Sequence, residues 1–368
     1  MSKRKVLGLV TMSAAAVLLL AACGNKSASN SMEKTTAGEK AAKKFSIVMV
    51  TDSGGVDDKS FNQSAWTAMQ AWGKEHGREK GAEGYNYIQS SGEKDYATNF
   101  KKAVSAKYDL IFAVGFTLQE AANKATEENK DNHFVTVDSV IKDQYTNGAS
   151  ILFAENESAY LAGIAAAKTT KTNHIGYIGG VKTETLIRFE AGFVAGAKSV
   201  NKDITVDRQY VGSFQDAGTG KTIANTMFAN GADVIYGAAG ASGLGVFTAA
   251  TDLMQADDSK QLWVIGVDLD QHEQGKYKTK SGEEKSVTLT STLKKVGEAV
   301  VKFAEATEKD GFKSGLTRYT LADGGVDLTD GQLSADVKDA VKKAKQDIID
   351  GKVKAPATEA ELDEFLKK

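Results

Sequence analysis

The sequence contains very little cysteine, histidine and proline, and this scarcity excludes several kinds of site. Cys23 is the only cysteine among the 368 residues, so no disulfide can form within the chain. None of the four histidines lies four residues from another, which excludes the paired helical histidines of an HExxH zinc site. The Asp-rich loop at 52–58 lacks the EF-hand calcium pattern, because glycine and valine occupy positions that need oxygen ligands. We therefore expect neither a metal site nor a cofactor.

The chain also lacks an excess of positive charge. Its 46 basic and 48 acidic residues give a net charge of −2, and removal of residues 1–22 with their three basic side chains would bring it near −5. A nucleic-acid-binding domain is expected to carry a basic face. We therefore expect no nucleic-acid partner.

Long apolar runs are absent after the first 22 residues. Before that point, three basic residues at 3–5 precede an apolar run from Val6 to Leu20, and the small-residue sequence Leu-Ala-Ala-Cys ends at Cys23. The apolar run is too short to span a bilayer comfortably. A charged start, a short apolar stretch and a small-residue cleavage site are typical of a signal peptide, which we predict at 1–22.

The position of Cys23 resembles the bacterial lipobox, in which the cysteine becomes the mature first residue and carries a diacylglyceryl thioether. The alternative is an incidental cysteine beside an ordinary cleavage site. Two acyl chains anchor a protein stably where one chain is marginal. We predict lipidation at Cys23 and a flexible tether over 23–44, which is rich in Asn, Ser, Lys, Ala and Thr. The remaining chain would lie on the extracytoplasmic face of a bacterial cell membrane, held by this anchor.

Strands and helical stretches alternate from Phe45 onward, which predicts βαβ units and largely parallel sheets. Residues 87–115 are echoed by 210–240, and each copy has a strand, a polar loop, an amphipathic helix and a second strand that closes on glycine. A later strand then ends at Asp138 in the first copy and at Asp268 in the second. The alternative is that any two doubly wound domains look alike at this level. Either interpretation predicts an α/β protein with two similar lobes, whose strand ends face each other across a ligand cleft.

Signals for an enzyme are weak. Ser242 has Gly240 two residues before it but Leu244 two residues after it, so the nucleophile-elbow pattern fails. The glycines of 237–245 follow the order G-x-x-G-x-G, which is the reverse of the dinucleotide fingerprint. Glycine here can instead bring backbone N–H groups close to a bound polar group. We predict a binding protein with no catalytic residues.

The strand ends carry the best candidates for a binding site. Asp52, Asp138 and Asp268 each end an apolar strand, either as capping residues or as acceptors for ligand hydroxyl or amino groups. Their matching places favour the second interpretation. Phe61 and Phe214 lie one in each lobe and could sandwich a flat ligand, although a residue such as Phe61, taken alone, is more often part of the core.

Seven motifs occur in order along the chain. They are the lipobox, D-S-G-G-V-D-D-K-S-F-N-Q (52–63), E-A-G-F-V-A-G (190–196), V-G-S-F-Q-D (211–216), A-A-G-A-S-G-L-G-V (238–246), I-G-V-D-L-D-Q (265–271) and T-S-T-L-K-K (290–295). Together they resemble the basic membrane protein family of substrate-binding lipoproteins, in particular its purine nucleoside receptor A-like members, over residues 23 to at least 300. The resemblance implies a type I periplasmic-binding fold with three crossings between the lobes. We accordingly expect an N-terminal lobe at 45–152 plus about 269–290, and a C-terminal lobe at 153–268 plus about 291–368.

The resemblance also implies delivery of a purine nucleoside to the permease and ATPase subunits of an ABC importer, by a protein that we expect to be a monomer. Phe61 and Phe214 would sandwich the base, and Asp52 and Asn62 would contact its edge or nearby groups. Four further residues would surround the ribose and the floor of the cleft: Asp138, Asp268, Gly240 and Lys294.

Other interpretations stay open at this point. The same fold could bind riboflavin or a sugar, because aromatic rings suit those ligands as well. A lipid-anchored nucleoside-processing enzyme is a second alternative, and a surface adhesin or regulatory protein is a third. The resemblance gives no role to Glu190, although that residue belongs to the motif at 190–196.

Overall fold

Apolar side chains on both faces of the β-strands explain why the sheets lie in the interior. In β1 (Ile47–Thr51), Ile47 and Met49 belong to one core cluster, Val48 and Val50 belong to another, and all four are fully buried. A strand with two buried faces is a nearly continuous apolar run, which is characteristic of sheets covered by helices on each side. The strand therefore lies between two hydrophobic clusters, one on each of its faces.

The computed structural model describes residues 43–257 and 259–367, which belong to one compact unit. The predicted signal peptide at 1–22, the lipidated Cys23 and the tether up to residue 42 lie outside the described residues. No helix in the described ranges is both long and apolar enough to cross a membrane.

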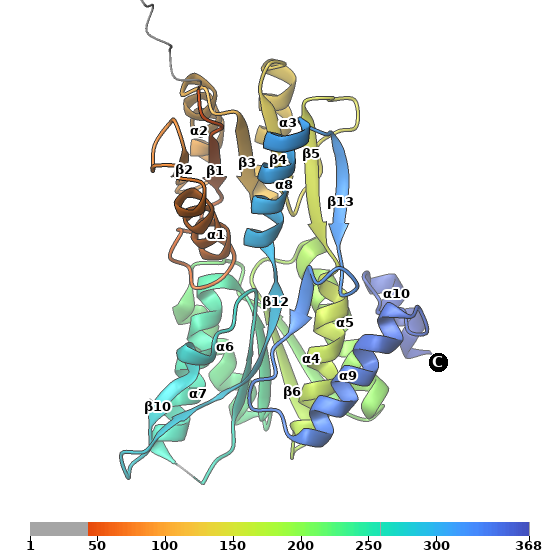
Figure 1. Ribbon diagram of the computed structural model, residues 1–368. Helices are drawn as coiled ribbons and strands as arrows, with labels where there is room; N and C mark the ends of the chain where they lie inside the picture. The colour runs from red at the N-terminus through yellow and green to blue at the C-terminus, as the bar shows by residue number, and fades with distance from the viewer. Residues whose placement is uncertain (1–42, 258, 368) are drawn as a thin grey trace, which may run out of the picture. The chain divides into compact units, whose positions relative to one another are not determined.

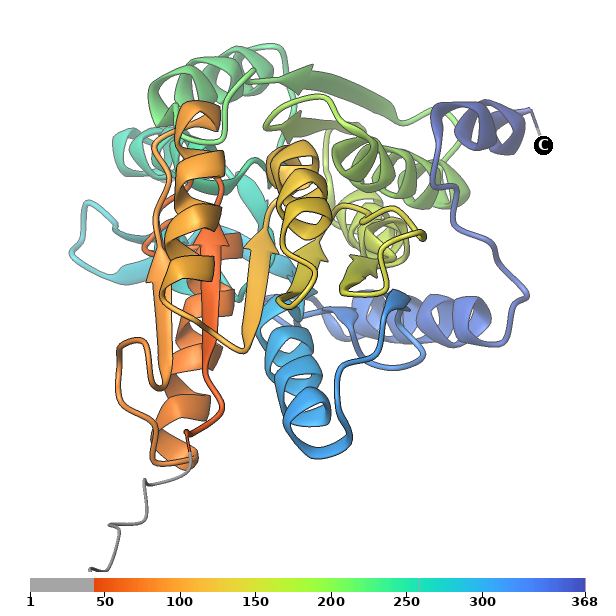
Figure 2. The same ribbon diagram turned by 90° about the horizontal axis from the view of Figure 1, so that it is seen from above.

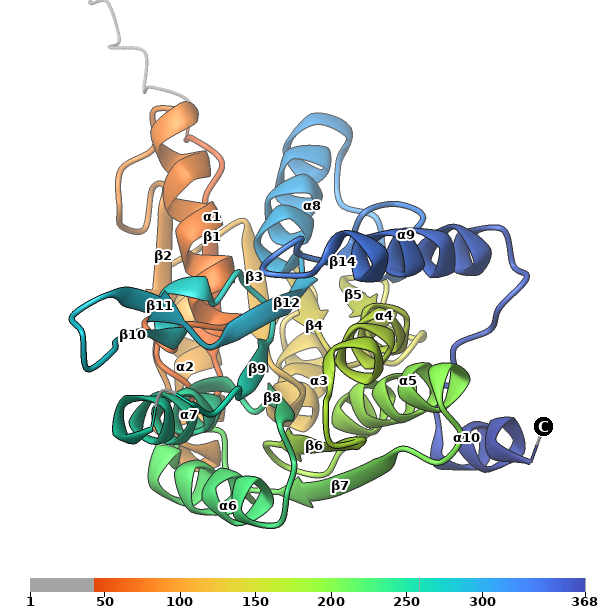
Figure 3. The same cartoon turned by 90° about the horizontal axis from the view of Figure 1, so that it is seen from below.

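The N-terminal lobe is built on a parallel sheet whose strands have the order β13-β5-β4-β3-β1-β2. Figure 3 shows α1 and α8 on one side of this sheet and α2 and α3 on the other. Besides β1, its elements are β2 (Tyr85–Ile88), β3 (Leu110–Val114), β4 (His133–Val137), β5 (Gly148–Phe153), β13 (Gly315–Tyr319), α1 (Phe61–Glu75), α2 (Glu93–Ser105), the short 3-10 helix η1 (Phe116–Leu118), α3 (Gln119–Glu128) and α8 (Val296–Asp310).

The C-terminal lobe is built on a second sheet with the order β14-β12-β9-β8-β6-β7, in which only β14 is antiparallel among the described strands. Its elements are α4 (Glu155–Thr169), β6 (His174–Gly179), α5 (Glu184–Val200), β7 (Thr205–Tyr210), α6 (Ala217–Ala229), β8 (Val234–Ala238), η2 (Gly240–Gly243), α7 (Leu244–Ala256), β9 (Trp263–Gly266), η3 (His272–Gly275), the hairpin of β10 (Lys276–Lys278) and β11 (Glu284–Ser286), β12 (Thr288–Lys294), β14 (Val326–Leu328), α9 (Ala335–Ile349) and α10 (Glu359–Leu366). Figure 2 shows α10, in dark blue, beside the green elements of this lobe.

The two sheets repeat one topology. Strands β2-β1-β3-β4-β5 of the first correspond in order to β7-β6-β8-β9-β12 of the second, and a short 3-10 helix follows β3 and β8 alike. The echo between residues 87–115 and 210–240 therefore corresponds to a repeated fold. The predicted α/β class and the two lobes with largely parallel sheets are confirmed.

The chain crosses between the lobes three times, as predicted, and Figure 1 allows the path to be followed. It leaves β5 at Ala154 for α4, leaves β12 at Lys295 for α8, and returns from β13 to β14 through residues 320–325.

The lobe boundaries within the last hundred residues differ from the expected ones. We expected 269–290 in the N-terminal lobe, but the segment there forms η3, the β10–β11 hairpin and the start of β12, which pairs with β9 in the C-terminal sheet. Conversely, α8 and β13 lie within the range expected for the C-terminal lobe, yet β13 pairs with β5 of the N-terminal sheet. The expectation was wrong because local patterns do not reveal which sheet accepts a strand.

Helices α4 and α5 approach each other closely because glycine occupies their contact. A Cβ atom at Gly192 would lie 2.2 Å from the Asn156 carbonyl oxygen, and one at Gly196 would lie 2.0 Å from that of Tyr160. Any larger side chain would force the helices apart. The motif at 190–196 is thus explained by packing, and this packing places the N-terminal ends of both helices beside the cleft.

Candidate functional site

The loop that follows β1 brings α1 to the rim of the cleft. Asp52 Oδ1 accepts a hydrogen bond of 2.8 Å from the Gly54 N–H, which turns the chain as it leaves the strand. The Asp58 carboxylate accepts from the backbone N–H groups of Ser60, Asn62 and Gln63 at 2.9, 2.9 and 3.0 Å. These donors have no partner within the helix, and a carboxylate near a helix N-terminus is stabilising. The start of α1 is therefore fixed at the cleft.

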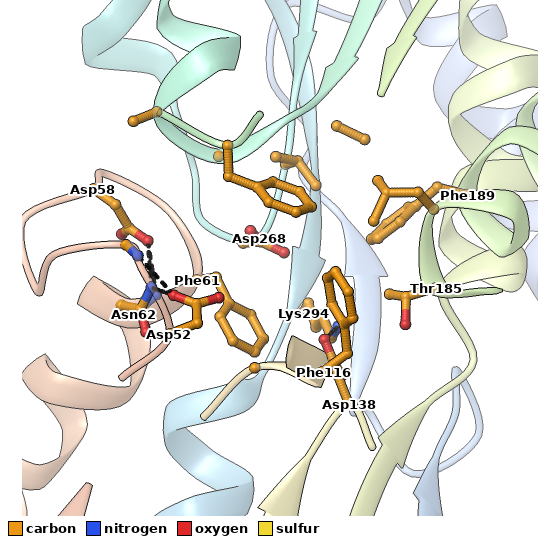
Figure 4. Close-up of a pocket in the computed structure, with 18 residues that line it drawn as sticks. Asp52, Asp58, Phe61, Asn62, Phe116, Asp138, Thr185, Phe189, Asp268 and Lys294 are labelled. Atoms are coloured by element: carbon orange, nitrogen blue, oxygen red, sulfur yellow. Dashed lines mark hydrogen bonds and ion pairs between the residues drawn. The ribbon is translucent and has the colours of Figure 1, made fainter. Parts of the chain in front are cut away.

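The amide of Asn62 is oriented by two carboxylates. Its Nδ2 group donates to Asp52 Oδ1 at 3.0 Å and to Asp58 Oδ2 at 3.2 Å, and Figure 4 shows the three side chains together. Because ionised carboxylates only accept hydrogen bonds, the nitrogen must face them. The buried Oδ1 atom of Asn62 has no hydrogen-bond partner among the described residues. The Oδ1 atom of Asn62 is therefore held in place as a hydrogen-bond acceptor for a ligand.

Asp138 and Asp268 occupy matching places at the ends of β4 and β9. Both have left-handed backbones, with φ of 65° and 66°, a conformation that aspartate tolerates better than most residues. Both side chains reach the opposite lobe, since Asp138 Oδ2 accepts from Lys294 Nζ and Asp268 Oδ2 accepts from Ser60 Oγ. The two aspartates thus join the lobes reciprocally across the cleft.

Lys294, the last residue of β12, is the buried cation of the site. Its Nζ atom also forms an ion pair of 2.8 Å with Glu155 Oε1, and it lies 5.1 Å from the ring centre of Phe61 and 5.9 Å from that of Phe189. Burial works to lower the pKa of Lys294, but the carboxylates of Asp138 and Glu155 outweigh burial and hold this pKa above its usual value. Lys294 is therefore protonated throughout the physiological range.

Three carboxyl groups of the site have a pKa above the usual value for aspartate. Burial raises the pKa of Asp52 to about 6, although its hydrogen bond from Asn62 opposes the rise. Burial likewise raises the pKa of Asp268 to about 6, against the opposing charge of Lys294. The pKa of Asp138 is also raised by burial, while Lys294 opposes this and Glu155 adds to it. These carboxylates are costly to ionise in the absence of a donor, so a ligand that donates hydrogen bonds would stabilise their charged form.

A cavity of about 620 Å³, measured with its open mouth, lies among these groups. All eight residues predicted to bind ligand line it: Asp52, Phe61, Asn62, Asp138, Phe214, Gly240, Asp268 and Lys294. The structure therefore brings them together, from both lobes, at one place.

Contacts between the lobes surround the cavity. The side chain of Gln215 donates to the Ser53 carbonyl oxygen, and Gln271 Nε2 donates to that of Lys59 at 2.9 Å. The ring of Phe214 meets the edge of Phe116, with centres 6.0 Å apart and planes at 66°. Both rings are partly exposed, and both line the cavity.

Comparison with known proteins then identifies the family. The family described as "ABC transporter substrate-binding protein PnrA-like" matches residues 45–359. The chain belongs to this family. It is thus a substrate-binding protein of an ABC transporter, and the resemblance recognised from its motifs is confirmed.

Three relatives of this PnrA-like protein illustrate the match. An "ABC transporter nucleoside-binding protein BmpA" of Lactococcus lactis subsp. cremoris is 49% identical, covering 96% of this chain and 99% of the relative. "Basic membrane protein A" of Borreliella burgdorferi is 30% identical, covering 85% and 88%. A solved ABC transporter solute-binding protein from Aeropyrum pernix K1 is 27% identical with a TM-score of 0.74, covering 88% and 97%. The last similarity confirms the predicted periplasmic-binding fold.

Several residues that line the cavity of this PnrA-like protein were not predicted. They are Gly54, Asp58, Gly115, Phe116, Thr185, Leu186, Phe189, Ala238, Ala241 and Val267. Thr185 could have been found from the sequence repeat. It is the second residue of α5, and Asn62 is the second residue of α1, the equivalent helix of the other lobe; both line the cavity. Phe189 had no such signal, because an aromatic residue within an apolar helix is most simply interpreted as core.

Ser242, whose neighbours match the nucleophile-elbow pattern only in part, has a structural role. Ser242 Oγ donates to the Ser213 carbonyl oxygen at 2.9 Å and accepts from the Asp216 N–H at 2.8 Å, so it holds the loop of Phe214. Within the described ranges, no three side chains of His, Cys, Asp or Glu are grouped so that they could hold a metal ion.

Proposed function

We propose that this protein binds purine nucleosides in the cleft and delivers them to the permease and ATPase subunits of an ABC importer. In this proposal Cys23 carries a diacylglyceryl anchor, and the protein acts as a monomer on the extracytoplasmic face of a bacterial cell membrane. Binding involves no chemical reaction. The 49% identical Lactococcus relative, named as a nucleoside-binding protein, supports the ligand class.

The observation that carries the proposal is the distribution of groups around one cavity. Phe61 and Phe214 come from opposite lobes, and a flat base stacked between them would gain about 1–3 kcal/mol per ring. Asp52 and Asn62 lie beside Phe61 and offer acceptors to the donor groups on a purine edge.

The other polar groups suit a ribose. Lys294 supplies a charged donor, and the buried Oδ1 atom of Asp138 has no hydrogen-bond partner among the described residues. A sugar hydroxyl both donates and accepts, so it could pair with these two groups at once. Asp268 and the backbone at Gly240 would complete the ribose site.

Isothermal titration of the purified protein, unfolded and refolded to remove carried-over ligand, tests this proposal. Adenosine, guanosine, inosine, uridine, riboflavin and ribose form the panel. We expect tight binding of at least one purine nucleoside and weak or undetectable binding of uridine and free ribose. Binding of riboflavin or a sugar without any purine nucleoside would contradict the proposal.

A second experiment separates binding from catalysis. The protein is incubated for a long period with inosine, and free hypoxanthine is measured. We expect none above the buffer control, and its catalytic release would instead favour a nucleoside-processing enzyme.

A further inference from the structure

A buried charged side chain lies behind the cavity and does not line it. Glu155 is the first residue of α4, directly after the first crossing between the lobes, and its side chain is 0% exposed. Burying a carboxylate is unfavourable unless it is paired with a cation or a hydrogen-bond donor. An apolar residue would fill the same space at a lower desolvation cost, so the charge of Glu155 needs a separate explanation. The two side chains that pair with Glu155, Lys294 and Arg188, indicate its role.

Those partners connect Glu155 to the cavity in two directions. Its Oε1 atom forms the 2.8 Å ion pair with Lys294 Nζ, and its Oε2 atom accepts a hydrogen bond of 2.7 Å from Arg188 Nε. Arg188 Nη2 in turn donates to Thr185 Oγ1 at 3.0 Å. A row of alternating charges thus runs from Asp138 through Lys294 and Glu155 to Arg188. Asp138 at one end lines the cavity, and Arg188 at the other end contacts the cavity-lining Thr185.

The contacts of Lys294 determine how many of its N–H donors remain for a ligand. An ammonium group carries three N–H donors. Asp138 accepts one of these hydrogen bonds, whereas Glu155 Oε1 lies 2.8 Å from Nζ in an ion pair without hydrogen-bond geometry. At least one donor therefore remains free to point toward a ligand beside the unpaired Oδ1 atom of Asp138. A lysine side chain has four flexible carbon atoms, so a single carboxylate would not fix this direction.

We propose that Glu155 is a positioning residue, held in place by Arg188, that aims Lys294 so that it and Asp138 together bind the ribose diol. This inference rests on the proposed function and adds to it. Glu155 then determines how strongly the site prefers ribonucleosides over nucleosides that lack the diol, although it touches no part of the ligand.

The test is the substitution Glu155→Gln, which keeps the size of the side chain and removes its charge. Titration with the best-bound purine ribonucleoside and with its 2′,3′-dideoxy analogue gives a ratio of two affinities. We expect the substitution to weaken ribonucleoside binding by roughly tenfold or more, as for loss of a charged hydrogen-bonding partner. Binding of the dideoxy analogue should change by less than about threefold, because it lacks the hydroxyls that Lys294 would hold.

Glu190→Gln is a matched control. Glu190 is also a buried glutamate beside an arginine, since it accepts from Arg208 Nη1 at 3.0 Å and from the Tyr210 hydroxyl at 2.5 Å, but it does not line the cavity. This substitution should leave the affinity ratio unchanged even if it lowers stability. The same contacts explain the role of Glu190 in the fold, because they connect α5 to the edge strand β7.

Three outcomes would overturn the inference. In the first, Glu155→Gln weakens both ligands by the same factor, and in the second it changes neither. If the Glu155→Gln variant fails to fold, Arg188→Lys is measured in its place. The third outcome is that Arg188→Lys leaves the ratio of the two affinities unchanged. Absence of purine nucleoside binding by the unaltered protein would overturn the proposed function instead, and the inference with it.

Discussion

The two lobes have the same strand order but bring different chemistry to the cleft. The N-terminal lobe supplies acidic and amide groups, namely Asp52, Asp58, Asn62 and Asp138, with the rings of Phe61 and Phe116. The C-terminal lobe supplies mainly apolar side chains, including Leu186, Phe189, Phe214 and Val267, with Asp268 and Lys294, the one cation among the described lining residues. A repeated fold thus places side chains at equivalent strand ends without requiring that they be alike.

Asp138 and Asp268 show this difference most directly. They have nearly the same φ and the same place in each sheet, but Asp138 meets a lysine and Asp268 meets a serine hydroxyl. Backbone topology sets where each carboxylate stands, whereas the partner from the opposite lobe sets its electrostatic environment. The following predictions test this difference between the lobes.

The largest effect is expected from Lys294→Met. The substitution leaves Asp138 and Glu155 without their shared cation, and breaking a buried ion pair in this way costs about 3–5 kcal/mol. Ser60→Ala removes the partner of Asp268 and should cost only about 1–3 kcal/mol. Urea unfolding at pH 7 measures both, and equal losses would show that the two aspartates are electrostatically equivalent.

The second effect concerns pH. Burial raises the pKa of Asp268 to about 6 in the folded protein, so this group favours folding at low pH, and that contribution is lost as the pH rises through 6. Asp268→Asn should therefore stabilise the ligand-free protein at pH 7, by up to about 3 kcal/mol, and the gain should vanish below about pH 4. Unfolding curves between pH 4 and 8 measure it, and a gain that does not depend on pH would contradict the assigned cause.

The third effect compares the two rings. Phe61→Ala and Phe214→Ala should each weaken purine nucleoside binding by about 1–3 kcal/mol, because each removes one stacking surface. Both rings pack partly against buried hydrophobic clusters, so we also expect moderate losses of stability. Titration and unfolding of each variant separate the two quantities. A large loss of stability with unchanged affinity would make that ring a core residue.

The last comparison concerns the glycines that follow β3 and β8. At Gly115 (φ 122°) an added Cβ would lie 2.6 Å from Asp52 Oδ2, whereas at Gly240 (φ 57°) its nearest contact would be 3.4 Å. Gly115→Ala should cost about 1–3 kcal/mol and displace Asp52, and Gly240→Ala about 1–2 kcal/mol with little effect on that carboxylate. Calorimetric melting and nucleoside affinity measure both. A larger loss of affinity in the Gly240 variant would reverse the expected order.

Much of the site could be predicted because its residues lie at strand ends. Asp52, Asp138 and Asp268 each follow an apolar run, and the repeat placed two of them at equivalent positions. Phe116, Phe189 and the Glu155–Arg188 pair could not be predicted, because nothing in their local sequence distinguishes them from core or surface residues.

Sequence patterns alone were enough to establish the two lobes, their repeated order of strands and helices, and the rim positions of the aspartates. These features depend on local periodicity, which acts over a few residues. The tertiary structure alone decided that β12 joins the second sheet and β13 the first, and that Lys294 meets Asp138, 156 positions away, and Glu155. Such pairings depend on where three crossings bring distant segments together, and on the low dielectric of the protein interior, where a buried charge must find a partner.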